Sequence, residues 1–125
     1  MSRIEELKRE AQAMQQYLEN DKSDTIEEYI GRLNTLGVYY ARSGAMLAEV
    51  KSLNNGEYAK LMCSEEGRAL VASFSPSIAK AYFKGLTAEF EALEVWLDRI
   101  NASCNKQCDN LRTLISYEKQ RAQIL

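Results

Sequence analysis

The sequence predicts an all-α protein: an antiparallel helical bundle built on a long helical hairpin, about residues 25–63 and 76–121, with an N-terminal helix packed on it. Apolar residues repeat with alternating spacings of three and four, which keeps one stripe of each helix facing a neighbouring helix. The sequence has only one proline and six glycines among 125 residues, and so few turn-forming residues favour long helices over a turn-rich β fold. The connections are short, which favours antiparallel neighbours within a single domain, 1–125.

The first helix is predicted over residues 3–20. Ser2 and Glu5 have the spacing of a capping box, in which each side chain bonds a free backbone N–H group at the start of the helix. The polar run Asn20–Ser23 ends this helix. Its apolar residues are Ile4, Leu7, Ala11, Met14 and Leu18.

The second helix is predicted to begin at Asp24, which can act as the N-cap, with Glu27 three residues later. Its apolar positions are Ile26, Tyr29, Leu33, Leu36, Tyr40, Leu47, Val50 and Leu61. The run Asn54–Gly56 disfavours a helix, because glycine costs about 1 kcal/mol there relative to alanine. The heptad phase nevertheless continues past it, so we expect one helix through about residue 63, with a break as the alternative.

A short helix is predicted from Ser64 to Ala72, at the tip of the hairpin, because serine can cap it and acidic residues follow. Ser75 and Pro76 then open one long helix of about 45 residues, or roughly 70 Å. Its apolar tracks are Phe83, Leu86, Phe90, Leu93, Leu97, Ile100, Cys104, Leu111 and Leu114.

The hairpin should place residue i opposite about residue 140 − i. Trp96 then falls near Gly44, and we expect its ring to fill a groove left by small residues. These small residues are Gly37, Ala41, Gly44, Ala45 and Ala48. Gln107 lies on a core track, where we expect it to fix the helix register or to be exposed.

The absence of histidine removes Ser-His-Asp and Cys-His catalysis and the commonest metal ligand. Cys104 and Cys108 share a helical face and could form half of a thiolate metal site, but only Cys63 remains as a third thiol, so we interpret the pair as core residues. We expect neither a metal nor another cofactor. The acidic residues are interpreted as helix-dipole partners or solvated faces: Glu27, Glu28, Glu65, Glu66, Glu89, Glu91 and Glu94.

The basic residues of the last third provide the strongest functional hypothesis. The net charge is −2, yet five basic and two acidic side chains follow from Arg99 onward. A basic row with an aromatic side chain can follow a phosphate backbone. We expect the row to share one helical face, with an ordinary solvated face as the alternative. The candidate residues for binding a partner or nucleic acid are Arg99, Lys106, Arg112, Tyr117 and Lys119.

The segment from Gln107 to Lys119 resembles the C-terminal helix of small all-helical proteins from bacteriophages and prophages of gut bacteria. The similarity centres on Asp109-x-Leu111-Arg112-x-Leu114-Ile115-Ser116. Such proteins are often encoded among early genes for recombination and the handling of single-stranded DNA. The resemblance therefore implies a setting in phage or mobile-element DNA metabolism, and no particular activity.

Together these patterns predict a non-enzymatic binding or assembly module, an accessory protein of phage or mobile-element DNA recombination or replication. It would dock another protein, or single-stranded DNA, through residues 99–121. The alternative is a protein–protein interaction module, such as an inhibitor of a host defence system, or an oligomeric scaffold. A slender bundle has a thin core, so we expect a homo-oligomer. No apolar run is long enough for a membrane span, and with no signal segment we expect a cytoplasmic protein.

Overall fold

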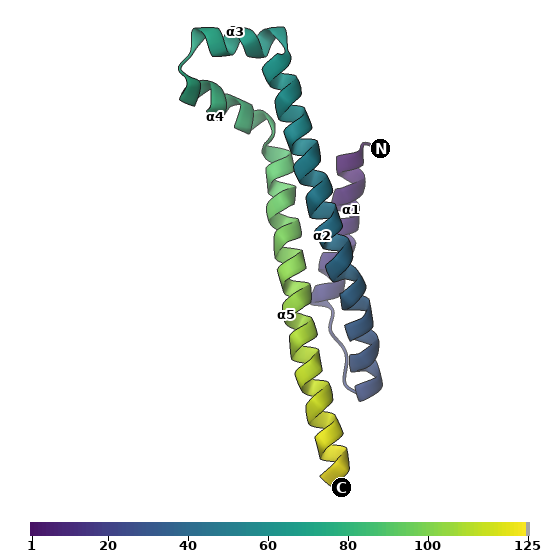
Figure 1. Ribbon diagram of the computed structural model, residues 1–125. Coiled ribbons are helices and arrows are strands. Elements are labelled where there is room, and N and C mark those ends of the chain that lie inside the picture. The colour runs from purple at the N-terminus through teal and green to yellow at the C-terminus, as the bar shows by residue number, and fades with distance from the viewer. Residues whose placement is uncertain (125) are drawn as a thin grey trace.

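The computed structural model describes residues 1–124, which form five helices and confirm the predicted all-α class (Figure 1). The two longest helices, α2 (Ile26–Cys63) and α5 (Ala88–Ile124), pack antiparallel as a hairpin. The N-terminal helix α1 (Arg3–Glu19) packs on this hairpin, as predicted. Two short helices, α3 (Glu65–Ser73) and α4 (Pro76–Leu86), connect the long ones and project sideways from one end of the rod.

The helix starts follow local capping chemistry. The capping box of Ser2 and Glu5 is present at the start of α1. The prediction that Asp24 caps α2 is wrong by one residue, because Thr25 occupies the N-cap and its hydroxyl oxygen accepts the backbone N–H of Glu28 at 3.2 Å. The Thr25 hydroxyl also donates to the Glu28 carboxylate at 3.1 Å, so this pair satisfies the start of the helix.

Helix α2 runs without a break through Asn54–Gly56, which confirms the expected continuity. The Asn54 side-chain amide donates to the Glu94 carboxylate of α5 at 3.2 Å. This contact between the two long helices offsets part of the low helix propensity of the segment. The short helix after Ser64 is also confirmed, with the Ser64 hydroxyl accepting the N–H of Gly67.

The predicted single helix from Pro76 to residue 121 is wrong, because the chain bends at Thr87. Thr87 has φ −105° and ψ 13°, outside the helical region. Its buried hydroxyl donates to the carbonyl of Phe83 at 3.2 Å, which also accepts the Thr87 backbone N–H, and threonine bonds of this kind often bend helices. The heptad phase continues across the bend, which explains why the repeat alone does not reveal it.

Buried apolar side chains form a core along the three packed helices. From α1 and α2 they are Leu7, Ala11, Met14, Leu18, Leu36, Met46 and Val50. From α5 they are Leu93, Leu97, Ile100, Cys104, Cys108 and Leu111. The register agrees with the prediction to within a few residues, because the Asn101 amide of α5 donates to the Tyr40 carbonyl of α2 at 2.9 Å and to the Ser43 hydroxyl at 3.0 Å.

The predicted pairing of Trp96 with small residues near Gly44 is wrong. The Trp96 indole N–H instead donates to the Gln15 side chain of α1 at 3.1 Å. A Cβ at Gly44 would meet Asn101 rather than the indole. The rotation of α5 about its axis thus turns Trp96 toward α1, and away from the small residues of α2.

Three predicted core positions are exposed in the structure. Leu86 is 52 % exposed because it lies on α4, which leaves the hairpin axis. Leu114 is 42 % exposed, since it lies two turns beyond Gln107, which contacts the last residues of α1. Tyr40 is 43 % exposed at the edge of the α2–α5 contact. Both the bend and the short length of α1 therefore limit the core.

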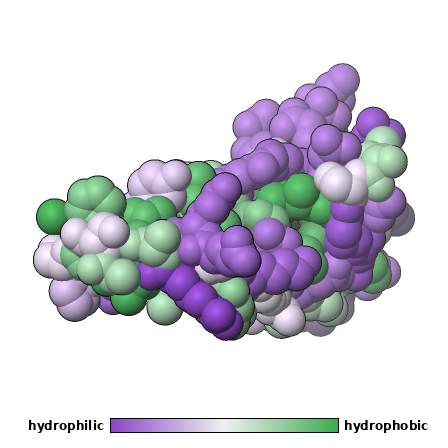
Figure 2. All heavy atoms as spheres, turned by 90° about the horizontal axis from the view of Figure 1, so that it is seen from above, coloured by the Kyte–Doolittle hydropathy of each residue, from purple (hydrophilic) through white to green (hydrophobic). Residues whose placement is uncertain are grey.

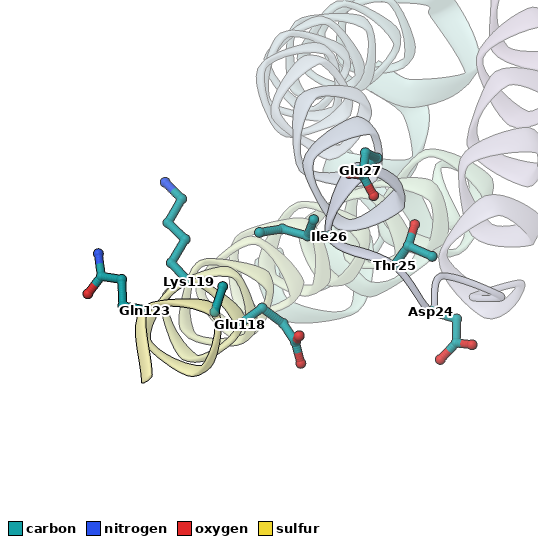
Figure 3. Close-up of a pocket in the computed structure, with 8 residues that line it drawn as sticks. Asp24, Thr25, Ile26, Glu27, Glu118, Lys119 and Gln123 are labelled. Carbon is teal, nitrogen blue, oxygen red and sulfur yellow. The ribbon is translucent and has the colours of Figure 1, made fainter. Parts of the chain in front are cut away.

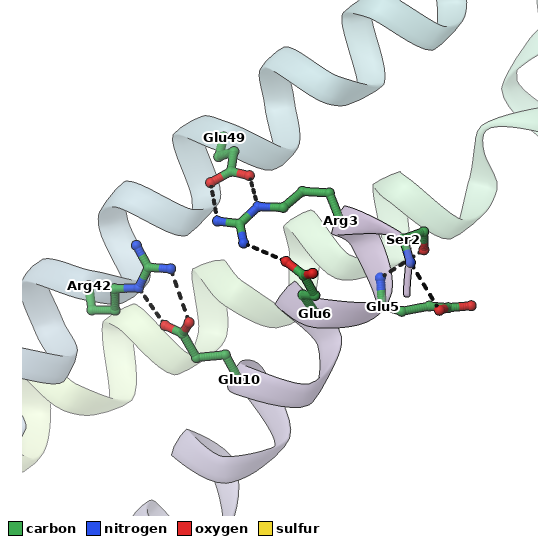
Figure 4. Close-up of polar contacts among 7 residues, drawn as sticks. All are labelled: Ser2, Arg3, Glu5, Glu6, Glu10, Arg42 and Glu49. Atoms are coloured by element: carbon green, nitrogen blue, oxygen red, sulfur yellow. Dashed lines mark hydrogen bonds and ion pairs between the residues drawn. The ribbon is translucent and has the colours of Figure 1, made fainter.

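Charged contacts fasten α1 to the hairpin. Arg3 forms an ion pair with Glu49 of α2, and Arg42 of α2 forms one with Glu10 (Figure 4). Lys8 pairs in the same way with Glu89 of α5. These pairs surround the apolar face of α1. None of the helices within residues 1–124 combines the length and apolarity needed to span a bilayer.

Candidate functional site

The five candidate residues of the C-terminal helix do not form one row. All lie on α5. A helix turns by about 100° per residue, so the seven-residue step from Arg99 to Lys106 keeps one face, whereas the six-residue step to Arg112 rotates by about 120°. Tyr117 returns to the face of Arg99 and Lys106, and Lys119 lies with Arg112. The expectation of a single basic face is therefore wrong.

Acidic residues lie beside this end of α5, some on α5 itself and some at the start of α2. Arg112 forms an ion pair with Asp109 at 2.9 Å, and Arg121 contacts Glu118 at 4.0 Å. The antiparallel hairpin places the start of α2 beside Lys119, around an open groove of about 510 Å³ (Figure 3). The residues lining this groove are Asp24, Thr25, Ile26, Glu27, Glu118, Lys119, Ala122 and Gln123. Its three carboxylates offset the positive charge of Lys119 and weaken the attraction for a polyanion.

Gln107 belongs to a polar network at the C-terminal end of α1. The buried Arg32 guanidinium donates to the Gln107 side-chain oxygen at 2.7 Å and to the Leu18 carbonyl at 3.4 Å. The Gln107 amide also donates to the Leu18 carbonyl, at 3.3 Å. Arg32 further lies over the Tyr17 ring, 4.7 Å from its centroid. These bonds reach carbonyl groups at the C-terminal end of α1, so Gln107 is half-buried and takes part in the packing of three helices.

The environments of the cysteines do not favour a reactive thiol or a metal site. Cys104 and Cys108 are buried in the core and Cys63 is exposed, with all three as free thiols. Burial raises the pKa of Cys104 to about 11, and burial also raises the pKa of Cys108. Thiols with raised pKa values are poor nucleophiles at neutral pH. In residues 1–124, no group of three or more Cys, Asp or Glu side chains is arranged to hold a metal ion.

The most prominent exposed apolar surface lies on α4, which the heptad repeat assigns to the long rod. Phe74, Ile78, Tyr82 and Leu86 are 51 %, 55 %, 51 % and 52 % exposed. The four-residue spacing places Ile78, Tyr82 and Leu86 along one side of α4, next to Ala81 and Gly85, whereas Phe74 is the C-cap of α3 and precedes α4 with an extended backbone. We call five residues of this side the α4 face: Ile78, Ala81, Tyr82, Gly85 and Leu86.

The other sides of α4 have different roles. Phe83 is buried and packs edge-to-face on Tyr58 of α2, with ring centroids 5.7 Å apart. Lys80 and Lys84 lie on the flank opposite Tyr82 and line a groove of about 290 Å³ with Asn54 and Tyr58. The residues of the α4 face are themselves uncharged, and Lys84 lies at its edge, one turn from Ala81.

Further apolar side chains are exposed near this helix. Met62 and Val71 are partly exposed beside α4. They line a small apolar pocket of about 120 Å³ together with Tyr58, Pro76, Ala79, Lys80 and Phe83. In Figure 2, which views this end of the molecule from above, apolar residues gather on the side where Figure 1 places α3 and α4, and hydrophilic residues predominate elsewhere.

The sequence does contain a signal for the α4 face. Residues 76–86 have apolar side chains on more of the helix surface than one neighbour can cover, with Phe83 facing one way and Tyr82 another. The heptad repeat by itself attributes this excess to a wide stripe on one long rod. Only the bend at Thr87 separates α4 from the hairpin and leaves this side uncovered.

Comparison of the chain with models of known protein families, with curated protein sequences and with solved structures found no match in any of the three. The resemblance of residues 107–119 to phage proteins therefore stays a prediction.

Proposed function

We propose that this protein is a non-enzymatic helical binding and assembly module that docks another protein chain through the α4 face. The observation that carries this proposal is the exposure of three large apolar side chains, Ile78, Tyr82 and Leu86, on one side of a short helix. Contiguous apolar surface of this kind is uncommon on soluble monomers and marks interaction sites. An aromatic anchor such as Tyr82 is also among the residues that contribute most at protein interfaces.

The packing of α3 and α4 supports the same proposal. Gly67 is the only buried residue of α3, and α4 buries only Ala79 and Phe83. Two short helices with so few buried side chains have little core of their own. A partner that covers the α4 face would supply the missing apolar contacts, so binding and stabilisation of these helices would be coupled.

For the biological setting, we retain the hypothesis of an accessory protein of phage or mobile-element DNA recombination or replication. It rests on the resemblance of residues 107–119 alone. An inhibitor of a host defence system, or an oligomeric scaffold, would use the same face and differ only in its partner. The α4 face thus specifies a mode of binding, namely burial of an amphipathic helix against another protein surface.

A photo-crosslinking amino acid placed at position 82 tests the docking proposal. In cells that express the whole chain, we expect adducts between position 82 and a protein, identified by mass spectrometry. The matched control is position 103, an exposed serine on the outer side of α5. Protein adducts at position 82 that are absent at position 103 support the proposal, and a lack of protein adducts at position 82 contradicts it.

Single-stranded DNA is the second candidate ligand. Arg99, Lys106 and Tyr117 share the outer face of α5, where a phosphate backbone could meet both cations while a base stacks on the ring. Among residues 1–124, neither Arg99 nor Lys106 takes part in an ion pair. Two unpaired cations form a small electrostatic footprint, so this candidate ranks behind protein docking.

A further inference from the structure

We propose that the space between α2, α3 and α4 binds a small aromatic carboxylate, with its ring in the apolar pocket beside Met62 and its acid group on Lys80. Such a molecule has one aromatic ring and one ionised carboxyl group on a short arm. The site lies on the flank of α4 opposite Tyr82, so this proposal goes beyond docking through the α4 face and does not depend on it.

The size of the apolar pocket suits a single ring. Its volume is about 120 Å³, and an apolar cavity of about 150 Å³ is known to hold benzene. A pocket of this size takes one ring and excludes the long chain of a lipid. Apart from Lys80, the lining residues are apolar or aromatic and come from all three helices: Tyr58, Met62, Val71, Pro76, Ala79 and Phe83.

The walls of the pocket favour an aromatic occupant. The rings of Tyr58 and Phe83 both line it and pack edge-to-face, with centroids 5.7 Å apart. The thioether of Met62 forms another part of the wall and is 40 % exposed. Aromatic rings pack favourably on the edges and faces of other rings, and methionine sulfur contacts ring edges. These walls therefore match an aromatic ring better than a polar group.

The basic side of α4 supplies the charge complementarity. Lys80 and Tyr58 line both the apolar pocket and the neighbouring groove of about 290 Å³, which Lys84 also lines one turn further along α4. Among residues 1–124, neither lysine takes part in an ion pair. A ring in the pocket therefore places an attached acid group beside two unpaired ammonium groups.

One carboxylate, that of Glu91, also lines the groove and reduces its positive charge. Glu91 does not line the apolar pocket, whereas Lys80 does. Lys80 is therefore the cation that best suits an anion whose ring occupies the pocket, and Lys84 adds a weaker attraction from the groove.

Occupation of the pocket should stabilise α3 and α4. These helices bury few side chains, and a ligand that binds only the folded state shifts the equilibrium toward it. The probe 3-phenylpropionate has one ring, a two-carbon arm and about eleven non-hydrogen atoms, so we expect a Kd of about 0.1–1 mM.

The central experiment is an NMR titration of the whole chain, labelled with ¹³C at the methionine methyl groups. Met62 lines the pocket, whereas Met14 and Met46 are buried in the core and serve as internal controls. We expect 3-phenylpropionate to shift the Met62 signal, assigned with Met62→Leu, to saturation. The Met14 and Met46 signals should stay in place and also report that each variant is folded.

Two further probes separate the ring from the charge. The alcohol 3-phenylpropan-1-ol has the same ring without the charge and should bind at least about threefold more weakly than the acid. Acetate has the charge without the ring and should not give a saturable shift at Met62.

Matched variants test the role of Lys80. Lys80→Gln should weaken binding of the acid about three- to fivefold and leave binding of the alcohol unchanged, because only the acid uses the ammonium group. Lys106→Gln removes an unpaired lysine of α5 and is the control for net charge; it should change neither. Val71→Asp, at a 45 % exposed position of the pocket wall, should weaken binding of the acid at least about fivefold by placing a like charge there.

The outcomes separate clearly. A saturable shift at Met62 that needs both ring and charge, and that Lys80→Gln weakens, supports the proposal. No shift at Met62 up to about 20 mM probe, equal affinities for acid and alcohol, or equal effects of Lys80→Gln and Lys106→Gln overturn it. A shift that grows without saturation indicates non-specific partitioning and overturns it as well. None of these results changes the adducts expected at position 82, so docking through the α4 face stands or falls separately.

Discussion

The Arg32 guanidinium donates to the Gln107 side-chain oxygen at 2.7 Å and joins the N-terminal part of α2 to the middle of α5. Both side chains also donate to the Leu18 carbonyl near the end of α1, so one network links three helices. Arg32 is only 5 % exposed, and its charge is compensated by carbonyl groups, the Tyr17 ring and Asp21 at 3.6 Å. This network fixes where α1 ends on the hairpin.

Removal of the Arg32 side chain should destabilise the protein. Arg32→Ala leaves the half-buried Gln107 side-chain oxygen without its donor and opens space in the packed region, so we expect a loss of about 2–4 kcal/mol in the free energy of unfolding. Urea denaturation followed by circular dichroism measures it. The matched control is Arg99→Ala, an exposed arginine of α5, which should change stability by less than about 0.5 kcal/mol. Equal effects of the two substitutions would contradict the role of the network.

Gly67 is required by the tight turn between α2 and α3. A Cβ at this position would lie 1.8 Å from the Leu61 carbonyl oxygen, a backbone atom that cannot simply move aside. Gly67→Ala should therefore cost about 1–3 kcal/mol and increase amide hydrogen exchange in α3.

Gly37 is the matched control for this prediction. It lies in the middle of α2, and a Cβ at this position would have no atom within 4 Å, so Gly37→Ala should stabilise the helix by up to about 1 kcal/mol. The same denaturation experiment compares both variants. If both stabilised the protein, the tight turn at Gly67 would not exist in solution.

The docking of α1 should depend on pH. Hydrogen bonds from Arg42 lower the pKa of Glu10, and hydrogen bonds from Arg3 lower the pKa of Glu49, each from a usual value of 4.5. A lowered folded-state pKa gives stability that is present above pH 4.5 and is lost as the pH falls below it. The thermal unfolding midpoint should therefore fall between about pH 6 and pH 3. The double variant Glu10→Gln with Glu49→Gln should have a lower thermal unfolding midpoint at pH 6. Its midpoint should also decrease less than that of the wild type between about pH 6 and pH 3. An equal decrease in the two proteins would show that these pairs do not hold α1.

Binding of single-stranded DNA is testable by fluorescence anisotropy with a labelled oligonucleotide. Since Arg99 and Lys106 share a face with Tyr117, Arg99→Ala with Lys106→Ala should weaken binding more than Arg112→Ala with Lys119→Ala. Affinity should also fall steeply with rising salt, because each phosphate contact releases a counterion. A flat salt response, or equal losses for the two pairs, would exclude this surface as a DNA site.

The local repeats carried enough information for the helices. The heptad phase predicted the α2–α5 hairpin and its approximate register, and capping residues predicted the starts of α1, α3 and α4. These features depend on neighbours a few residues apart, which a sequence displays directly. The sequence left the role of Gln107 open between fixing the helix register and exposure, and only its contacts with Arg32 and the Leu18 carbonyl show that it is part of the packing.

The tertiary structure decided the rest. The bend at Thr87 is accompanied by a hydrogen bond from its buried side chain to the Phe83 carbonyl, and the heptad repeat passes through it unchanged. That bend turns α4 away from the hairpin and exposes the α4 face. The direction of Trp96 and the acidic surroundings of Lys119 likewise depend on how helices rotate and meet, which sequence spacing does not encode. The sequence by itself determined the helices and their pairing, whereas only the packing of whole helices decided which apolar residues remain free to bind.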